Sequence, residues 1–310
     1  MHDTGAAFLD QQAAARPQVV RAKSYQAKVE QLWTDGLPRG SLTGWPSLDQ
    51  YYTVAPGQWT LVTGYPSMGK SEFVDALAVN LSHQGWKFLV YSPENQPTEI
   101  HLAKLAEKLA LKPFGAGAGA ERMSLAEAKE HLSTINERFR FIQPALDSPP
   151  TIPELLEAIT PELEEFSGTD SAPVGVVIDP WNEVETSRQA GMSETEFVSK
   201  SLTQLRNWAR HHNVHVWLVA HPQKMKRENG KLPIPTPDSV SGSAHFWNKA
   251  DCALSIHIAD RERSHEVSIL VQKMRFKHLG RRGLTTLRYD IATGRYRDIS
   301  VLPRPITSWA

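Results

Sequence analysis

The sequence predicts an α/β fold: a mostly parallel, twisted sheet flanked by helices, with an antiparallel extension at its C-terminal end. From about residue 41 onward, apolar β-rich runs alternate with helical patterns, as in a doubly wound sheet. Several of the runs are nearly continuous in apolar residues, as strands covered on both faces must be. After residue 250 the strands follow one another closely without helices, which predicts the antiparallel extension at one edge of the sheet.

The expected elements can be placed along the chain in order. Strands rich in β-branched and aromatic residues are expected at residues 59–64, 87–92, 138–143, 174–179, 214–220, 252–258 and 267–273. Apolar residues at helical spacing predict helices at residues 73–84, 97–111, 124–139, 151–166 and 193–212. The segment LTTLRYD, a turn at TGR and the segment YRD complete the C-terminal extension, at residues 284–298.

Three regions are expected: a tail and linker helix at residues 1–40, one α/β domain at 41–300 and a short tail at 301–310. In the first region, Val29, Leu32 and Trp33 recur at helical spacing. A short lone helix cannot bury its own apolar side, so it must dock either on its own domain or on a neighbouring subunit.

Composition excludes several classes of protein. Lys plus Arg and Asp plus Glu are balanced at 34 each, so a nucleic-acid site would have to be a local patch. Cys252 is the only cysteine, which excludes an internal disulfide and a structural zinc site and makes a reducing cytoplasm the default location. The N-terminal residues contain no secretory h-region and no apolar stretch is long enough to span a membrane.

Residues 64–71, GYPSMGKS, fit the pattern GxxxxGK[ST] between an expected strand and an expected helix. In such a loop, backbone N–H groups and a helix N-terminus surround the phosphates of ATP or another nucleoside triphosphate. Lys70 would reach the β- and γ-phosphates, and Ser71 offers a hydroxyl to Mg²⁺. The residues assigned to nucleotide binding are Gly64, Pro66, Ser67, Met68, Gly69, Lys70 and Ser71. The alternative, a glycine-rich turn without a ligand, does not need the strand and helix that flank this loop.

Three further polar residues lie at the ends of expected strands on the same edge of the sheet. Asp179 is a candidate for holding Mg²⁺ with Ser71, although aspartate is common at strand ends. Glu94 is a candidate for the base that polarises water, and its alternative role is that of a carboxylate at a helix N-terminus. His221 could contact the γ-phosphate, and its alternative is a histidine at the edge of the core.

Two basic segments remain. Lys224, Lys226, Arg227 and Lys231 lie in a polar loop just after His221, where they either contact a DNA backbone or form a solvated loop. Lys273 and Arg275 alternate at the end of a strand, so both point to one face. Such a face either binds nucleic acid or supplies cations to the γ-phosphate of a neighbouring site, a role that suits the planar fork of arginine.

Taken in order, the segments GYPSMGKS, YSPEN, VVIDPWN, LVAHPQK, SGSAHFWNKAD and VQKMRFKHLGRRG resemble the motif succession of DnaB-type hexameric replicative helicases. The resemblance covers residues 41–300 and is strongest to the phage and mitochondrial Twinkle-like branch, where a histidine stands at the position of His221. It implies a RecA-like P-loop fold, Glu94 as catalytic base, Asp179 on Mg²⁺, and His221 as phosphate sensor. It also implies Lys273 and Arg275 acting on the nucleotide of the neighbouring subunit, and the loop of Lys224 to Lys231 facing DNA in a central channel.

The expected function is therefore an ATP-driven DNA helicase motor that forms a ring, by resemblance a hexamer with 5′ to 3′ polarity, on single-stranded DNA. The resemblance also implies primase and polymerase partners and a location in the cytoplasm or the mitochondrial matrix. With only some 40 residues ahead of the motor and no zinc-ribbon cysteines, no primase activity is expected of this chain. Two alternatives stay open: a RecA- or RadA-like recombination ATPase that does not unwind, and a monomeric P-loop kinase or signalling module.

Overall fold

The structure of the 310-residue chain is a computed structural model. It describes residues 19–116, 121–143, 149–167, 172–184, 192–223, 233–240, 244–259 and 265–299. The chain divides into two units, one up to Pro38 and one from Arg39 onward. In the first, η1 (Ala22–Tyr25) and α2 (Gln26–Asp35) contain no buried residue, and Trp33 is 87% exposed. Among the described helices, none has the length and hydropathy needed to cross a membrane.

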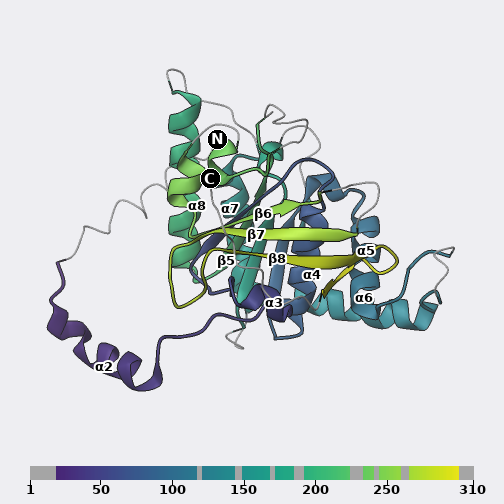
Figure 1. Cartoon of the computed structure of the whole chain (residues 1–310), viewed down its shortest axis with the longest axis horizontal. Coiled ribbons are helices and arrows are strands. Elements are labelled where there is room, and N and C mark those ends of the chain that lie inside the picture. Colours follow the sequence, from purple (N-terminus) through teal and green to yellow (C-terminus); the bar gives the residue numbers. More distant parts are fainter. Residues whose placement is uncertain are drawn as a thin grey trace, which may run out of the picture. The chain divides into compact units, whose positions relative to one another are not determined.

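The second unit is built on one sheet (Figure 1). Among the described residues it has nine strands in the order β3-β2-β4-β5-β1-β6-β7-β8-β9. The strands are β1 (Trp59–Thr63), β2 (Lys87–Tyr91), β3 (Phe139–Ile142), β4 (Val174–Ile178), β5 (His215–Ala220), β6 (Cys252–His257), β7 (Glu266–Met274), β8 (Gly283–Asp290) and β9 (Arg295–Asp298). The pairs from β3 to β6 are parallel, and β7, β8 and β9 add on as antiparallel strands.

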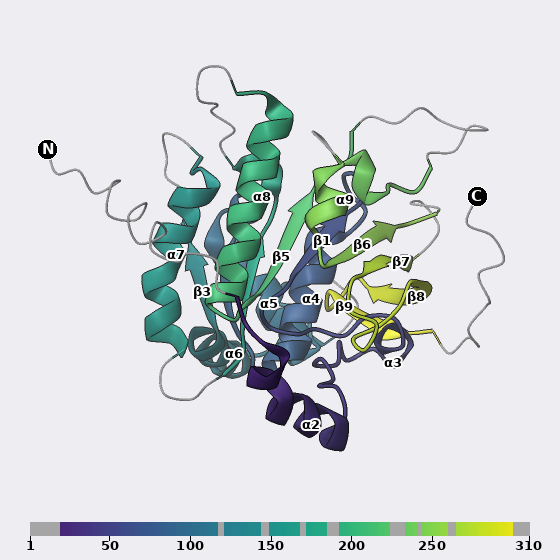
Figure 2. The same ribbon diagram turned by 90° about the vertical axis from the view of Figure 1, so that its left-hand side faces the viewer.

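The predicted fold class is confirmed, including the antiparallel extension. The structure corrects where the extension begins. The first strand after residue 250, β6, pairs in parallel with β1, so the antiparallel extension begins only at β7. Figure 2 shows β6 to β9 following one another on the side of the sheet away from β3.

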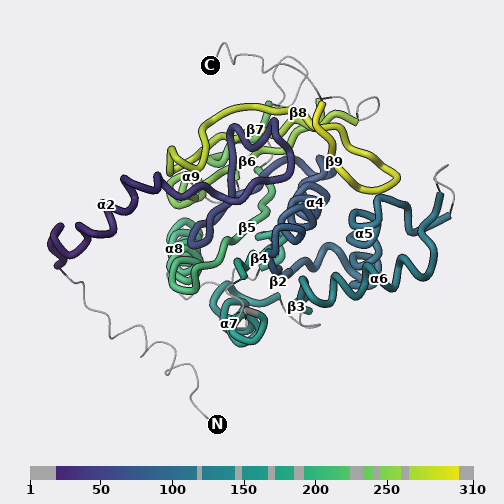
Figure 3. Tube along the Cα trace, turned by 90° about the horizontal axis from the view of Figure 1, so that it is seen from below, coloured from purple at the N-terminus to yellow at the C-terminus, as the bar shows by residue number. Residues whose placement is uncertain are grey.

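Helices cover both faces of the sheet (Figure 3). One face carries α4 (Lys70–Ser82), α5 (Thr98–Ala110) and α6 (Leu125–Arg138), and the other carries α7 (Ile152–Ser167) and α8 (Glu194–His211). The short elements are α3 (Pro46–Asp49), η2 (Pro93–Asn95), η3 (Trp181–Glu183), η4 (Pro237–Ser239) and α9 (His245–Lys249), which packs on α8. Ser124 and Ser193 begin α6 and α8 with capping boxes, which explains where these two helices start.

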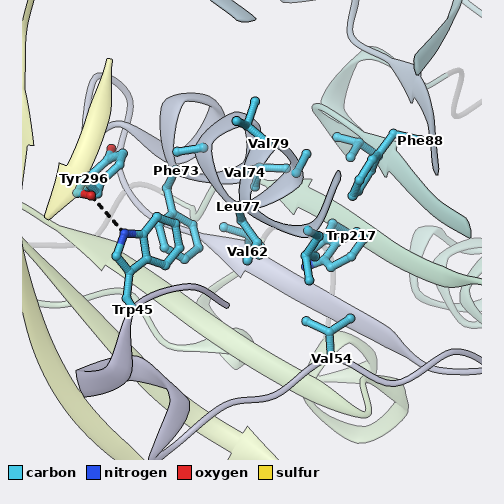
Figure 4. Close-up of a cluster of buried hydrophobic side chains, with 14 of the residues drawn as sticks. Trp45, Val54, Val62, Phe73, Val74, Leu77, Val79, Phe88, Trp217 and Tyr296 are labelled. Carbon is cyan, nitrogen blue, oxygen red and sulfur yellow. Dashed lines mark hydrogen bonds between the residues drawn. The ribbon is translucent and has the colours of Figure 1, made fainter. Parts of the chain in front are cut away.

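The sheet separates two apolar clusters. The cluster under α4, α5 and α6 includes the stacked rings of Trp45 and Phe73, whose centroids lie 5.4 Å apart. In the same cluster, Trp45 Nε1 donates a hydrogen bond of 3.0 Å to the carbonyl oxygen of Tyr296 in β9 (Figure 4). The other cluster lies under α7 and α8. Burial on both faces is why β4 and β5 are apolar at nearly every position.

A chain of buried hydrogen bonds links the start of β5 to β1 and to the segment that precedes β1. His215 Nδ1 donates to the carbonyl oxygen of Ala55 at 2.8 Å, which fixes the tautomer because a carbonyl can only accept. His215 Nε2 then accepts from Thr60 at 2.9 Å, Thr60 accepts from Tyr52 at 2.9 Å, and Tyr52 accepts from Trp217 at 3.1 Å. Each member is satisfied only while the imidazole is neutral.

We expect His215 to make the stability of the fold depend on pH. Complete burial lowers the pKa of His215 to about 4, against about 6.5 in an unfolded chain. A lowered pKa means that this contribution is fully present above about pH 6.5 and is lost as the pH falls toward 4. Between pH 7 and pH 5, urea unfolding should show a loss of about 2 kcal/mol from this group. His215→Gln should remove that part of the loss, whereas the exposed control His278→Gln should not. An equal pH dependence in all three proteins would contradict the assignment.

Candidate nucleotide site

The loop between β1 and α4 has the backbone of a phosphate-binding loop. Gly64 has φ 157°, and a Cβ there would lie 2.5 Å from the carbonyl oxygen of Ile256 in β6, so no larger residue fits. Gly69 has φ 79°, in the left-handed region that favours glycine, and directly precedes α4. Met68 is buried, and its sulfur accepts a hydrogen bond from the backbone N–H of Ile258. The loop therefore passes close to β6 at Gly64 and is bonded through Met68 to the residue that follows β6.

Lys70 and Ser71 open α4 at the end of this loop. The Lys70 side chain is buried, and its Nζ donates to the carbonyl oxygen of Tyr65 at 3.2 Å, which folds the cation back over the loop. Ser71 donates to Asp179, the residue that follows β4. Burial raises the pKa of Asp179 to about 6; the Ser71 hydrogen bond opposes the rise, and the carboxylates of Asp75 and Glu94 add to it.

These two side chains fit a magnesium ion by their chemistry. A hydroxyl oxygen and a carboxylate oxygen are hard ligands, which is what Mg²⁺ selects, and phosphates and water complete its shell in nucleotide sites. Among the described residues, no group of three or more His, Cys, Asp or Glu could form an all-protein metal cage. Burial is the main cause of the raised pKa of Asp179, and a bound cation beside this carboxylate would favour its charged form.

Glu94 and His221 meet at the same edge of the sheet. Glu94 lies in η2, just after β2, and His221 directly follows β5. His221 Nε2 lies 3.4 Å from Glu94 Oε1. Burial lowers the pKa of His221, and the positive charge of Lys70 lowers it further, so the imidazole is neutral at pH 7. The side chain of Asn182 accepts a hydrogen bond of 3.1 Å from the backbone N–H of His221 and so fixes this residue to η3.

The turn that carries Glu94 is supported from α5. Lys104 Nζ donates to Asn95 Oδ1 at 3.1 Å and lies 3.5 Å from Glu72 of α4. Glu72 in turn pairs with the buried Lys108 at 2.5 Å. This network joins the helix that starts at Lys70 to the turn that holds the carboxylate, and it fixes the distance between them.

A third ion pair between the same two helices joins Asp75 of α4 to His101 of α5. His101 Nε2 lies 3.1 Å from both carboxylate oxygens. Burial alone would raise the pKa of Asp75, but the charge and hydrogen bond of His101 outweigh it and lower the pKa. The same pairing raises the pKa of His101 against the effect of its burial. Together the two residues hold α4 against α5 by a charged contact in the core.

Lys273 and Arg275 lie at the opposite edge of the sheet. Met274, at the end of β7, pairs with Cys252 at the start of β6, whereas the phosphate loop follows the end of β1. Arg275 bonds to Asp251, which bonds to Trp59 at the start of β1, and the five residues of β1 cover about 17 Å before the phosphate loop begins. Both side chains are also turned toward the carbonyl groups of α9, so neither cation reaches the phosphate loop of its own chain. Lys273 Nζ donates to the carbonyl oxygens of Trp247 and Asn248, and Arg275 Nη2 donates to that of Asn248 at 2.9 Å.

The predicted site thus falls into three parts. One part lies together at the carboxyl edge of the parallel strands, as predicted: the loop from Gly64 to Ser71, with Glu94, Asp179 and His221. Lys273 and Arg275 share one face, also as predicted, but at the far edge. Lys224, Lys226, Arg227 and Lys231 lie outside the described residues.

Sequence reasoning missed the residues that hold this site in place. The partner of Asn182 lies 39 residues away in the chain, and the partner of Asp75 lies 26 residues away. Lys104 of α5 contacts the turn that precedes this helix. The only signal for Asn182 is its position three residues after Asp179, at the end of the same expected strand.

A phosphate loop between β1 and α4, with a carboxylate at each of two neighbouring strand ends, defines the class of P-loop ATPases with a RecA-like fold. A model of an AAA domain matches residues 18–227, and the chain belongs to this family. The Twinkle homolog protein, chloroplastic/mitochondrial, of Arabidopsis thaliana is 39% identical over 277 residues, which are 87% of this chain and 38% of that protein. The chain thus spans about two fifths of the length of this relative, and the predicted resemblance to Twinkle-like motor domains is confirmed.

Solved structures agree on the fold. The ATPase domain of G40P superposes with a TM-score of 0.75 at 16% identity and covers 91% of this chain and 100% of that one. A DnaB-like replicative helicase gives 0.73 at 18% identity over 91% of this chain and 69% of that one. The RadB recombinase gives 0.54 at 18% identity over 83% of this chain and 99% of that one.

If Glu94 is the base that polarises water, Glu94→Gln should lower ATP turnover by about 100-fold or more, because an amide cannot take the proton. The affinity for ATP should change little, since Glu94 does not belong to the phosphate loop. Glu99→Gln, a nearby substitution on α5, serves as the matched control and should keep wild-type turnover. Steady-state phosphate release and titration with a fluorescent ATP analogue measure both quantities. Turnover by Glu94→Gln at the level of the control would exclude this role.

Proposed function

We propose that this chain is the ATP-driven motor of a replicative DNA helicase, which assembles head to tail into a ring of six on single-stranded DNA and moves 5′ to 3′. Support for a helicase motor comes from the similarity to the Twinkle homolog protein. The ring, its size and the polarity rest on the family resemblance of the motifs.

One observation carries the composite-site part of this proposal: the two halves of an ATPase site lie at opposite edges of one sheet. The phosphate loop, Glu94, Asp179 and His221 occupy one edge, and Lys273 and Arg275 occupy the other. A single chain therefore cannot close its own site. Head-to-tail association brings the cations of one subunit to the nucleotide of the next, and a closed ring leaves no site incomplete.

Within the site each residue has a definite task. Backbone N–H groups of the loop and Lys70 bind the phosphates, and Glu94 takes a proton from the attacking water. The neutral His221, 3.4 Å from Glu94, can orient that carboxylate and register the γ-phosphate. Ser71 and Asp179 would hold Mg²⁺, which when bound neutralises charge on the phosphates.

The remaining assignments concern partners. The loop from Lys224 to Lys231 follows His221 in the chain, so a change at the γ-phosphate would pass directly into a segment suited to a DNA backbone. The exposed apolar residues of α2, Val29, Leu32 and Trp33, suit contact with an adjacent subunit. Primase and polymerase are partners by family resemblance, and a compartment that replicates DNA, cytoplasm or organelle matrix, is the expected location.

The test is ATP hydrolysis with Mg²⁺, with and without single-stranded DNA, at several protein concentrations, followed by unwinding of duplexes that carry a 5′ or a 3′ tail. A composite site predicts a rate that rises faster than linearly with protein concentration and increases with DNA. Helicase polarity predicts unwinding from the 5′ tail. DNA-stimulated hydrolysis without unwinding would favour the recombination ATPase, whose fold the RadB structure shares. A linear rate that ignores DNA would favour the monomeric P-loop enzyme.

Arg275→Ala should reveal whether the site is shared between subunits. Removing a cation that faces the transferring phosphoryl group should lower turnover by about 100-fold or more while ATP binding is retained. Subunits with Arg275→Ala, mixed with Glu94→Gln subunits, should recover activity, because some interfaces then join an intact Glu94 to an intact Arg275.

Arg297→Ala is the control for this substitution, since Arg297 is 70% exposed on β9 and pairs with Asp290. It should leave turnover unchanged. A mixed ring that is no more active than the sum of its two inactive parents would argue against action on the neighbouring subunit.

A further inference from the structure

Arg275 is held from two sides by groups that belong to one segment, Asn248 to Asp251. Its Nε lies 2.9 Å from Asp251 Oδ1 in an ion pair. Its Nη2 donates to the carbonyl oxygens of Asn248 at 2.9 Å and Ala250 at 3.2 Å. Its backbone N–H donates to the carbonyl oxygen of Asp251 at 2.8 Å. The side chain is still 32% exposed, so part of the guanidinium is open to a ligand.

Asp251 has no exposed surface and is itself fixed. Its second oxygen, Oδ2, accepts from the backbone N–H of Trp59 at 3.3 Å, and Trp59 is the first residue of β1. Arg210 of α8 lies 3.5 Å from Oδ1. A fully buried carboxylate needs the cations beside it, so turning Arg275 away would leave a buried negative charge with only one ion-pair partner among the described residues.

The short helix α9 is anchored as well, which fixes the carbonyl groups that bind Arg275. Lys249 Nζ reaches across to α8, where it donates to the carbonyl oxygen and the hydroxyl of Ser199 at 2.5 and 2.9 Å. The indole nitrogen of Trp59 donates to the carbonyl oxygen of Lys249 at 3.1 Å. Hence the segment whose carbonyl groups bind Arg275 is bonded to both α8 and β1.

We propose that Asp251 is a positioning residue for Arg275: it holds the guanidinium in one orientation, ready for the phosphates of the neighbouring subunit. The proposal rests on the proposed function, because it gives Arg275 the trans-acting role argued above. Fixing the cation beforehand removes the cost of ordering a long side chain during the reaction, and a displacement of about 1 Å in such a group can lower a rate 100-fold.

A double-mutant cycle on turnover tests this proposal. Asp251→Asn should lower kcat about tenfold and Arg275→Ala about 100-fold, and the double variant should be no worse than Arg275→Ala alone. A residue that acts through Arg275 has nothing left to position once the guanidinium is gone. A merely structural role would instead multiply the two losses. ATP affinity should stay close to wild type in Asp251→Asn. Because loss of a buried ion-pair partner lowers stability, all turnover is measured well below the unfolding midpoint of this variant.

Asp49→Asn provides the matched control, since the Asp49 carboxylate accepts from the N–H and hydroxyl of Thr43 at 2.6 and 2.7 Å, away from Arg275. It should leave kcat unchanged in both backgrounds. If Asp251→Asn does not fold, Asp251→Glu takes its place in the cycle, because it keeps the charge and shifts the carboxylate by one methylene.

The outcomes distinguish a failure of the trans-acting role of Arg275 from a failure of the positioning role of Asp251. Unchanged turnover in Arg275→Ala would overturn the trans-acting role and the positioning role together. A large loss in Arg275→Ala, combined with wild-type kcat in Asp251→Asn or with multiplied losses in the double variant, would overturn only the positioning role of Asp251.

Discussion

Strand direction is the constraint on which the site depends. Because β1, β2, β4 and β5 are parallel, the residues that follow them all emerge at one edge of the sheet. This is what brings Lys70, Glu94, Asp179 and His221 together from four distant parts of the sequence. The same constraint carries Lys273 and Arg275 away, since β7 runs antiparallel to β6. One sheet thus presents a phosphate site at one edge and a pair of cations at the other.

Local patterns predict the parts of the site that depend on strand ends and loop backbone. The phosphate loop needs glycine where φ is positive or where β6 approaches closely, and the sequence shows both glycines. Glu94, Asp179 and His221 are predictable because an apolar run marks each strand and the next polar residue lies at its end. The roles of these residues remain predictions, since only their placement is settled by the fold.

The supporting contacts could not be predicted, because they depend on the register between elements far apart in the chain. Lys104 reaches Glu72 only because α5 packs along α4, and no periodicity in either segment encodes that approach. The contact between Asp251 and Arg275 is formed only because the end of β7 lies beside the start of β6, and no local pattern around Asp251 predicts it. The parallel pairing of β6 with β1 could not be predicted either, because the residue pattern of a strand does not reveal the strand's direction.

The buried strands also connect the two edges mechanically. Trp59, which bonds Asp251, begins the strand that ends at the phosphate loop, and His215 begins the strand that ends at His221. These strands are packed on both faces, and a close-packed sheet does not deform easily. Under the proposed function, a change at the nucleotide would therefore move the sheet as one body together with Arg275. The displacement would have to be taken up between subunits, as the translocation of a ring motor requires.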